Sequence, residues 1–128
     1  MSLRLKVPRV LGTVRAELIA PSVLRVEGVL SQDDVRRDLA EVLVQAHDHV
    51  VASKLPTLTV DVRALSYANS SAIRVFIDMA SRAQRAGYRL IVEIDGSITW
   101  HSLNFAVLQS LAPQSVELRD VRRAAGSP

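Results

Sequence analysis

The stretch LTVDVRALSYANSSAIRVF, residues 58–76, decides the fold, because a β-rich apolar run passes into a helical pattern through three small polar residues. Residues 57–65 are mostly apolar and β-branched, which predicts a central strand covered on both faces. From Ser71 onward the apolar residues recur at helical spacing, and Gly87 stands where a C-terminal cap belongs. These apolar residues are Ile73, Phe76, Ile77, Ala80 and Ala83.

The flanking sequence also alternates between strand-like and helix-like spacing of its apolar residues. Residues 14–28 alternate apolar and charged positions about a turn at 20–22, which predicts a hairpin. Ser31 precedes Asp34 at the capping-box offset, so we expect a helix to about residue 53, ended by Pro56. A buried strand at 88–94, a helix at 97–111 capped by Ser97 and a strand at 115–121 follow. The expected fold is α/β, a mixed β-sheet in the order β-β-α-β-α-β-α-β with helices packed on the sheet.

Length and composition indicate one globular domain. The 128 residues are 48% hydrophobic and 23% charged, which is ordinary for a folded protein. We expect an N-terminal extension at 1–12, a domain at 13–121 and a flexible tail at 122–128. The absence of cysteine excludes disulfides and thiolate chemistry. The N-terminus lacks an apolar signal-peptide core and no long apolar run occurs, which favours a soluble, cytoplasmic protein without membrane partners.

The basic balance of the chain does not predict nucleic-acid binding. Basic residues outnumber acidic residues by 16 to 13, giving a net charge of +3. The arginines are scattered along the chain with acids between them, and only 4% of the residues are aromatic. Nucleic-acid binding needs a concentrated basic patch or aromatic stacking platforms, so a mixed solvated surface is the better interpretation.

The polar junction Asn69-Ser70-Ser71 has two compatible interpretations from residue type alone. Asparagine and serine are favoured N-caps, so Asn69 is expected to cap the helix while the serines satisfy its first N–H groups. The same position could instead present a hydroxyl to another protein. A phosphate there would lie at a helix N-terminus, where the dipole stabilises negative charge.

Catalytic, metal and nucleotide sites are poorly supported. Ser70 lacks the flanking glycines of a nucleophile elbow, although His101 with Asp61 or Asp95 is conceivable as a base and its orienting acid. His47 and His49 are two apart and diverge on a helix, so no metal site is expected. The five glycines form no phosphate-binding loop, and we expect no cofactor. Phe105 is expected in or beside the core, and Trp100 at the start of its helix as half-buried surface, a lid or a partner anchor.

The element order and four segments together resemble the STAS domain family, which includes the anti-sigma factor antagonists. The resemblance covers residues 13–119. Its segments are VEGVLS at 26–31, LTVDVRALSY at 58–67, NSSAI at 69–73 and RAQRAGYRLIV at 82–92.

In antagonists of this family the site reads Asp-Ser-Ser/Thr-Gly followed by an apolar residue, and its first serine is phosphorylated by a partner kinase. Carried over by position, that serine is Ser70, with Ser71 as an alternative acceptor. Asn69 replaces the aspartate and Ala72 replaces the glycine, whereas Ile73 matches. Asparagine keeps the capping oxygen but loses the charge, and alanine adds a methyl group where a partner backbone would approach.

The resemblance implies a non-catalytic regulatory module that binds a serine protein kinase or anti-sigma-type protein and releases it when Ser70 is phosphorylated. The expected partner surface groups residues near the helix start, with a homodimer also possible. An alternative is a STAS-like scaffold that never switches, and a third is a small-molecule or nucleotide binder. The partner-surface candidates are Ser31, Gln32, Asp33, Ser71, Arg74, Asp78 and Arg82.

Overall fold

The computed structural model describes residues 9–11, 14–30 and 33–121, and these form one mixed sheet with three helices. The strand order across the sheet is β1-β2-β3-β4-β6-β7, and β5 pairs with β3 beside this path. In chain order the elements are β1 Arg9–Leu11, β2 Val14–Ala20, β3 Val23–Leu30, α1 Asp33–Ala52, β4 Thr57–Asp61, β5 Leu65–Ala68, α2 Ser70–Ala86, β6 Arg89–Ile94, α3 Thr99–Leu111 and β7 Val116–Asp120.

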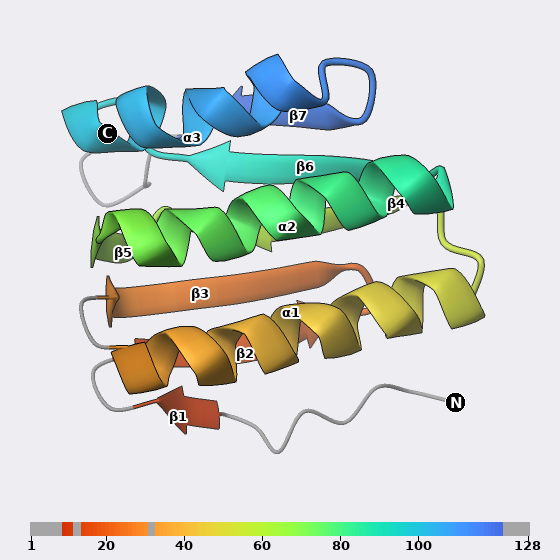
Figure 1. The fold of residues 1–128 in the computed structure, drawn as a ribbon, viewed down its shortest axis with the longest axis horizontal. Coiled ribbons are helices and arrows are strands. Elements are labelled where there is room, and N and C mark those ends of the chain that lie inside the picture. The colour runs from red at the N-terminus through yellow and green to blue at the C-terminus, as the bar shows by residue number, and fades with distance from the viewer. Residues whose placement is uncertain (1–8, 12–13, 31–32, 122–128) are drawn as a thin grey trace, which may run out of the picture.

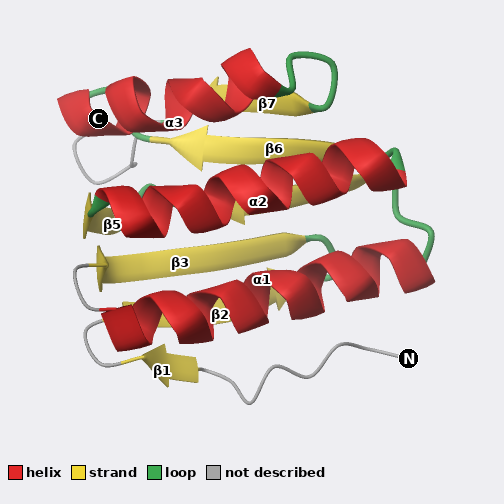
Figure 2. Cartoon of the chain, in the orientation of Figure 1, coloured by secondary structure: helices red, strands yellow, loops and turns green. Residues whose placement is uncertain are grey.

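The expected mixed sheet is confirmed. The hairpin of β2 and β3 is antiparallel, whereas β3–β4, β4–β6 and β6–β7 are parallel. One strand was not predicted, because β1 has only three residues and shows no period; it pairs antiparallel with β2. All three helices lie on the same side of the sheet (Figure 1). Figure 2 shows the resulting two layers, one of helices and one of strands.

The single strand predicted at 57–65 is wrong, because the chain bends after Asp61 and continues as β5. The Asp61 carboxylate accepts a hydrogen bond from the Arg63 backbone N–H, and the N–H of Leu65 donates to the Val62 carbonyl, which makes a turn. On the facing strand, Gly28 has a φ of 115°, a conformation that favours glycine. The β3–β5 register shifts at that glycine, so β3 pairs first with β4 and then with β5.

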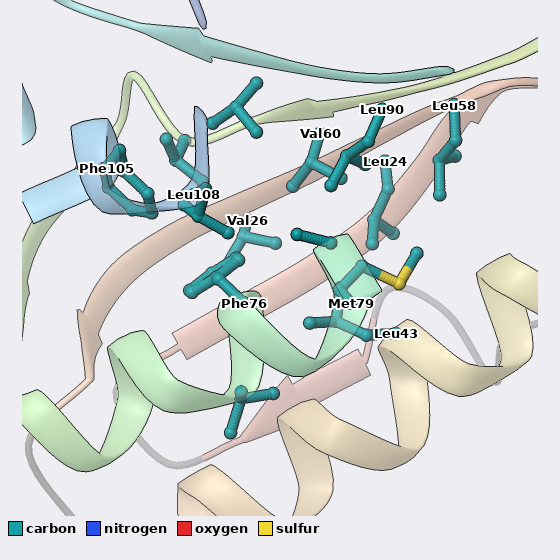
Figure 3. Packing of buried hydrophobic residues seen from close by; sticks show 14 of the residues in the cluster. Leu24, Val26, Leu43, Leu58, Val60, Phe76, Met79, Leu90, Phe105 and Leu108 are labelled. Carbon is teal, nitrogen blue, oxygen red and sulfur yellow. The ribbon is translucent and has the colours of Figure 1, made fainter. Parts of the chain in front are cut away.

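The expectation that the central strand is covered on both faces is also wrong. In β4, Leu58 and Val60 are buried, whereas Thr57 and Thr59 are half-buried. Side chains alternate between the faces of a strand, so one face meets the helices and the other has no helix above it (Figure 1). Figure 3 shows the core between the layers, where side chains from the strands meet those of the helices. The labelled members are Leu24, Val26, Leu43, Leu58, Val60, Phe76, Met79, Leu90, Phe105 and Leu108.

The helix ends agree with the sequence at α2 and differ at α3. Gly87 caps the C-terminus of α2 with φ 84°, and its N–H donates to the Ala83 carbonyl, as expected from its position. The cap predicted at Ser97 is wrong, because the N-cap of α3 is Ile98, which makes no side-chain cap bond. Ser97 instead donates its N–H and hydroxyl to the Asp95 carboxylate in the loop before α3.

Candidate functional site

The candidate site lies at the carboxyl ends of the central strands, where helices α1 and α2 begin. The last residue of β3, Leu30, is paired with the last residue of β5, Ala68. Helix α1 begins at Asp33 and helix α2 at Ser70, so both helix N-termini lie at this end of the sheet (Figure 1). The predicted partner residues Ser31 and Gln32 lie outside the described residues.

Asn69 is the N-cap of α2. Its backbone is extended, with φ −77° and ψ 173°, and its side-chain Oδ1 accepts a hydrogen bond of 2.9 Å from the Ala72 backbone N–H. The Asn69 carbonyl accepts the first helical bond, from the Ile73 N–H. This is the geometry of an N-cap, in which the residue before the helix pairs one of the four N–H groups that lack a helical acceptor.

Ser70 is the first residue of α2, and it is exposed, whereas Ser71 is half-buried. Because Asn69 provides the capping oxygen, the Ser70 hydroxyl is not needed for that role. The first turn of α2 contains no acidic residue. A negative charge added to Ser70 would therefore meet the positive end of the helix dipole without a carboxylate beside it in that turn.

Three of the four predicted partner residues of α2 form an exposed row, and the fourth, Ser71, is half-buried. Arg74, Asp78 and Arg82 are all exposed, and they follow one another at intervals of four residues from Ser70. Residues four apart in a helix share a face, so this row leads directly from the candidate hydroxyl. Asp78 and Arg82 also line a shallow groove between α1 and α2, whose other walls are Ala40, Leu43, Val44, Val75 and Met79.

His101 is a buried residue whose two ring nitrogens both bond to backbone groups, so neither nitrogen is available to Ser70 as a base. Its side chain is fully buried, with 0% exposure. The Nε2–H donates to the Leu65 carbonyl at 2.7 Å, and Nδ1 accepts from the Asp95 N–H at 3.1 Å. Both ring nitrogens are thus paired with backbone groups, which places the ring hydrogen on Nε2. Sequence reasoning missed this role, although His101 shares its helical stripe with the buried Phe105 and Leu108.

The two acids considered as orienting groups have other partners. Asp61 is only 3% exposed, and its carboxylate accepts bonds from the Nε and Nη2 of Arg63 at 3.0 Å. Burial raises the pKa of Asp61, but the hydrogen bonds and charge of Arg63, with the charge of Arg25, outweigh it and hold that pKa below its usual value. Asp95 accepts bonds from Ser97.

The two aromatic residues of α3 differ in burial, in agreement with one of the predicted alternatives. Phe105 is fully buried and meets Phe76 of α2 edge to face, with ring centroids 5.3 Å apart. Trp100 is half-buried and packs against the His101 ring, with ring centroids 4.4 Å apart. Its position fits the half-buried interpretation better than a free lid.

The two histidines of α1 point to different partners. The His47 Nδ1 shares a hydrogen bond of 2.7 Å with the Tyr88 hydroxyl, whereas the Nε2 of His49 lies 3.0 Å from the Pro21 carbonyl. Within the described ranges, no three His, Asp or Glu side chains group in a way that could hold a metal ion. In the same residues, no helix combines the length and apolarity required to cross a membrane.

Comparison with known proteins supports the fold. No family model matches the chain, and no curated protein sequence matches it. A solved structure does: the crystal structure of an anti-sigma factor antagonist from Mycobacterium paratuberculosis is similar with a TM-score of 0.58 and 19% sequence identity. The similarity covers 85% of this chain and 86% of that protein. The chain therefore has a STAS-like fold, the architecture of an anti-sigma factor antagonist.

Proposed function

We propose that this protein is a non-catalytic regulatory module, spanning residues 13–121, that binds a cytoplasmic serine protein kinase or anti-sigma-type partner. Phosphorylation of Ser70 releases the partner. The observation that carries the proposal is the exposed Ser70 hydroxyl at the first position of α2, beside a cap that Asn69 provides alone. The STAS-like fold supports it, because an antagonist of known structure shares this architecture.

The release step follows from charge. A phosphate carries about −1.5 to −2 charges at neutral pH and three acceptor oxygens. In the free protein the N–H groups of the first turn and the dipole of α2 stabilise that charge, and Arg74 lies one turn further along. Under a packed partner the same charge must be desolvated or repelled. The bound state is therefore weakened more than the free state, without a change of fold.

The partner surface of the proposal is the exposed row of α2 together with Ser71 and the sequence from 31 to 33. It comprises Arg74, Asp78 and Arg82 of that row, the half-buried Ser71, Asp33 at the start of α1, and the sequence positions Ser31 and Gln32. Arg74 and Arg82 alternate with Asp78, so a complementary partner would present charges of both signs.

The test is intact-mass spectrometry of the protein purified from its native cell, in resting and stressed growth. Wild type, Ser70→Ala, Ser71→Ala and the matched control Ser81→Ala are compared, because Ser81 is an exposed serine further along the same helix. A single phosphate is expected on wild type and on Ser81→Ala and is expected to be absent from Ser70→Ala. A phosphate that persists in Ser70→Ala and disappears in Ser71→Ala would move the site to Ser71.

A capture experiment tests the partner. Immobilised Ser70→Ala protein is expected to retain a serine kinase or anti-sigma-type protein from the native lysate, and Ser70→Glu is expected to lose it. If no growth condition yields a phosphate and both variants retain the same proteins, the switch is refuted and the non-switching scaffold takes its place.

A further inference from the structure

Strand β7 forms one edge of the sheet and presents its backbone outward. Among the described strands, only β6 pairs with β7. The Leu90 N–H donates to the Ser115 carbonyl, and the Val121 N–H donates to the Ile94 carbonyl, so the odd-numbered residues of this segment turn toward β6. Backbone groups alternate along a strand, which leaves the N–H and C=O groups of Leu118 and Asp120 directed away from β6.

The sequence of β7, Val-Glu-Leu-Arg-Asp, is complementary to itself when reversed. In an antiparallel pair centred on Leu118, Glu117 of each copy lies opposite Arg119 of the other. A shift by two residues in one direction sets Glu117 opposite Glu117, and a shift in the other sets Arg119 opposite Arg119. Like charges directly opposite each other are unfavourable, so the charges select the register centred on Leu118.

The backbone selects the same register. Leu118 directs both its groups outward, so at the centre of the pair it exchanges two hydrogen bonds with Leu118 of the second copy. The Asp120 N–H then donates to the Val116 carbonyl of that copy. The Val116 N–H makes no bond to the second copy, because it already donates to the Ala112 carbonyl of its own chain. Glu117 and Arg119 fall at the non-hydrogen-bonded positions, where opposite side chains approach most closely.

Helix α3 lies in front of this edge and could lie beside α3 of a second copy related by a two-fold axis (Figure 1). It contains no Asp, Glu, Lys or Arg, so a second α3 would bring no like charges beside it. Two of its large apolar residues are unusually exposed, Leu103 at 72% and Leu111 at 56%. A two-fold axis places the same surface of each copy against the other, so that surface must be complementary to itself. A helix without charges beside a self-complementary strand meets this condition.

We propose that this protein forms a two-fold dimer in which β7 pairs antiparallel with β7 of a second copy, centred on Leu118, so that the two sheets become one. Glu117 and Arg119 set the register of the pair. The proposal does not depend on a phosphate at Ser70 and goes beyond the partner switch.

The first test is sedimentation equilibrium of the full chain over about a hundred-fold range of concentration, since mass action makes association depend on concentration. Wild type is expected to approach the dimer mass. Glu117→Arg and Arg119→Glu are each expected to weaken association about ten-fold or more, because each sets like charges opposite one another twice in the pair. Arg15→Glu is the matched control, since it makes the same charge change at an exposed arginine on β2.

A mixture of the two charge variants separates register from general electrostatics. In a heterodimer of Glu117→Arg with Arg119→Glu, both contacts again join opposite charges. The mixture is therefore expected to recover the dimer that each variant alone has lost. Leu118→Pro removes an outward N–H that does not bond to β6, and it is expected to abolish the dimer while circular dichroism shows a folded chain.

Three results would overturn the proposal. The first is a wild type that stays monomeric at every concentration. The second is a control, Arg15→Glu, that weakens association as much as Arg119→Glu. The third is a chain that dimerises only after residues 122–128 are removed, because the edge would then be occupied by the end of the same chain.

Discussion

Asn69 and Ser70 are neighbours with different tasks. The Asn69 side chain holds the Ala72 N–H at 2.9 Å and begins the helix, whereas the Ser70 hydroxyl is exposed at its first position. Asparagine and both serines are all good capping residues, so their types alone could not decide which one caps α2. The extended backbone at Asn69 decides it.

This division predicts unequal stability effects at adjacent positions. Asn69→Ala is expected to lower the free energy of unfolding by about 1 kcal/mol, because the Ala72 N–H loses its acceptor. Asn69→Asp keeps the oxygen and is expected to preserve stability. Ser70→Ala is expected to change it by less than about 0.5 kcal/mol, as for other exposed sites. Urea unfolding measures all three, and equal losses in Asn69→Ala and Ser70→Ala would contradict this assignment.

His101 is the residue whose loss should cost most among the polar groups of the site. Removing the ring leaves the Leu65 carbonyl and the Asp95 N–H without their partners and opens a cavity under α3. His101→Ala is therefore expected to destabilise the protein by about 3 kcal/mol. His49→Ala removes one hydrogen bond at a half-buried site and serves as the control, with an expected loss of about 1 kcal/mol or less. Similar unfolding midpoints for the two variants would refute the buried role of His101.

At the level of elements, periodicity in the sequence predicted three helices, the hairpin and the strands that became β6 and β7. It failed where the pattern is set by distant partners. Residues 57–65 read as one strand because Val62 continues the apolar and β-branched composition of Leu58 and Val60, but β5 leaves that line to pair with β3. Asp61 was a local turn signal, since its carboxylate accepts the Arg63 N–H. The three residues of β1 are too few to show a period.

His47 of α1 shares a hydrogen bond with the Tyr88 hydroxyl just before β6, and its titration predicts that stability depends on pH. Burial lowers the pKa of His47, and the charges of Arg82 and Arg85 lower it further against the opposing effect of Asp48. The unfolded chain, with an ordinary value of 6.5, then binds more protons than the folded chain between the lowered pKa and 6.5. Stability is expected to rise with pH across that window and to be constant above it.

Urea midpoints measured from pH 5 to 8 test this expectation, because, against the opposing effect of burial, the hydrogen bonds and charge of Arg63 hold the pKa of Asp61 below its usual value and keep its titration out of that range. His47→Gln is expected to flatten the rise, because glutamine does not titrate. Burial also raises the pKa of Tyr88, so its hydroxyl remains protonated and available to His47 throughout the range. A rise of equal size in His47→Gln would assign the effect to another group.

On the scale of the whole molecule, the face of the sheet without helices is covered by paired charges. Glu117 accepts bonds from Arg89 and Arg119, and Asp61 lies 3.7 Å from Arg25 on a neighbouring strand. Long paired side chains shield the sheet here, and Ile91 is only 8% exposed although it lies outside the main core. The other candidate binding surfaces are the carboxyl end of the sheet and, on the β7 edge, the backbone groups of Leu118 and Asp120 that are directed away from β6.

These two surfaces are predicted to work independently. Antiparallel pairing of β7 reverses the direction of one sheet, so the two Ser70 sites of a dimer would lie at opposite ends of the joined sheet, each open to its own partner. Effects at distant sites without shared contacts add, so Ser70→Glu is expected to leave the self-association constant within about two-fold of wild type. Glu117→Arg is likewise expected to retain the partner captured by Ser70→Ala. Sedimentation equilibrium and the capture experiment measure the two effects separately. A loss of dimer in Ser70→Glu would show instead that the site and the β7 edge are coupled, and a phosphate would then control assembly as well as partner release.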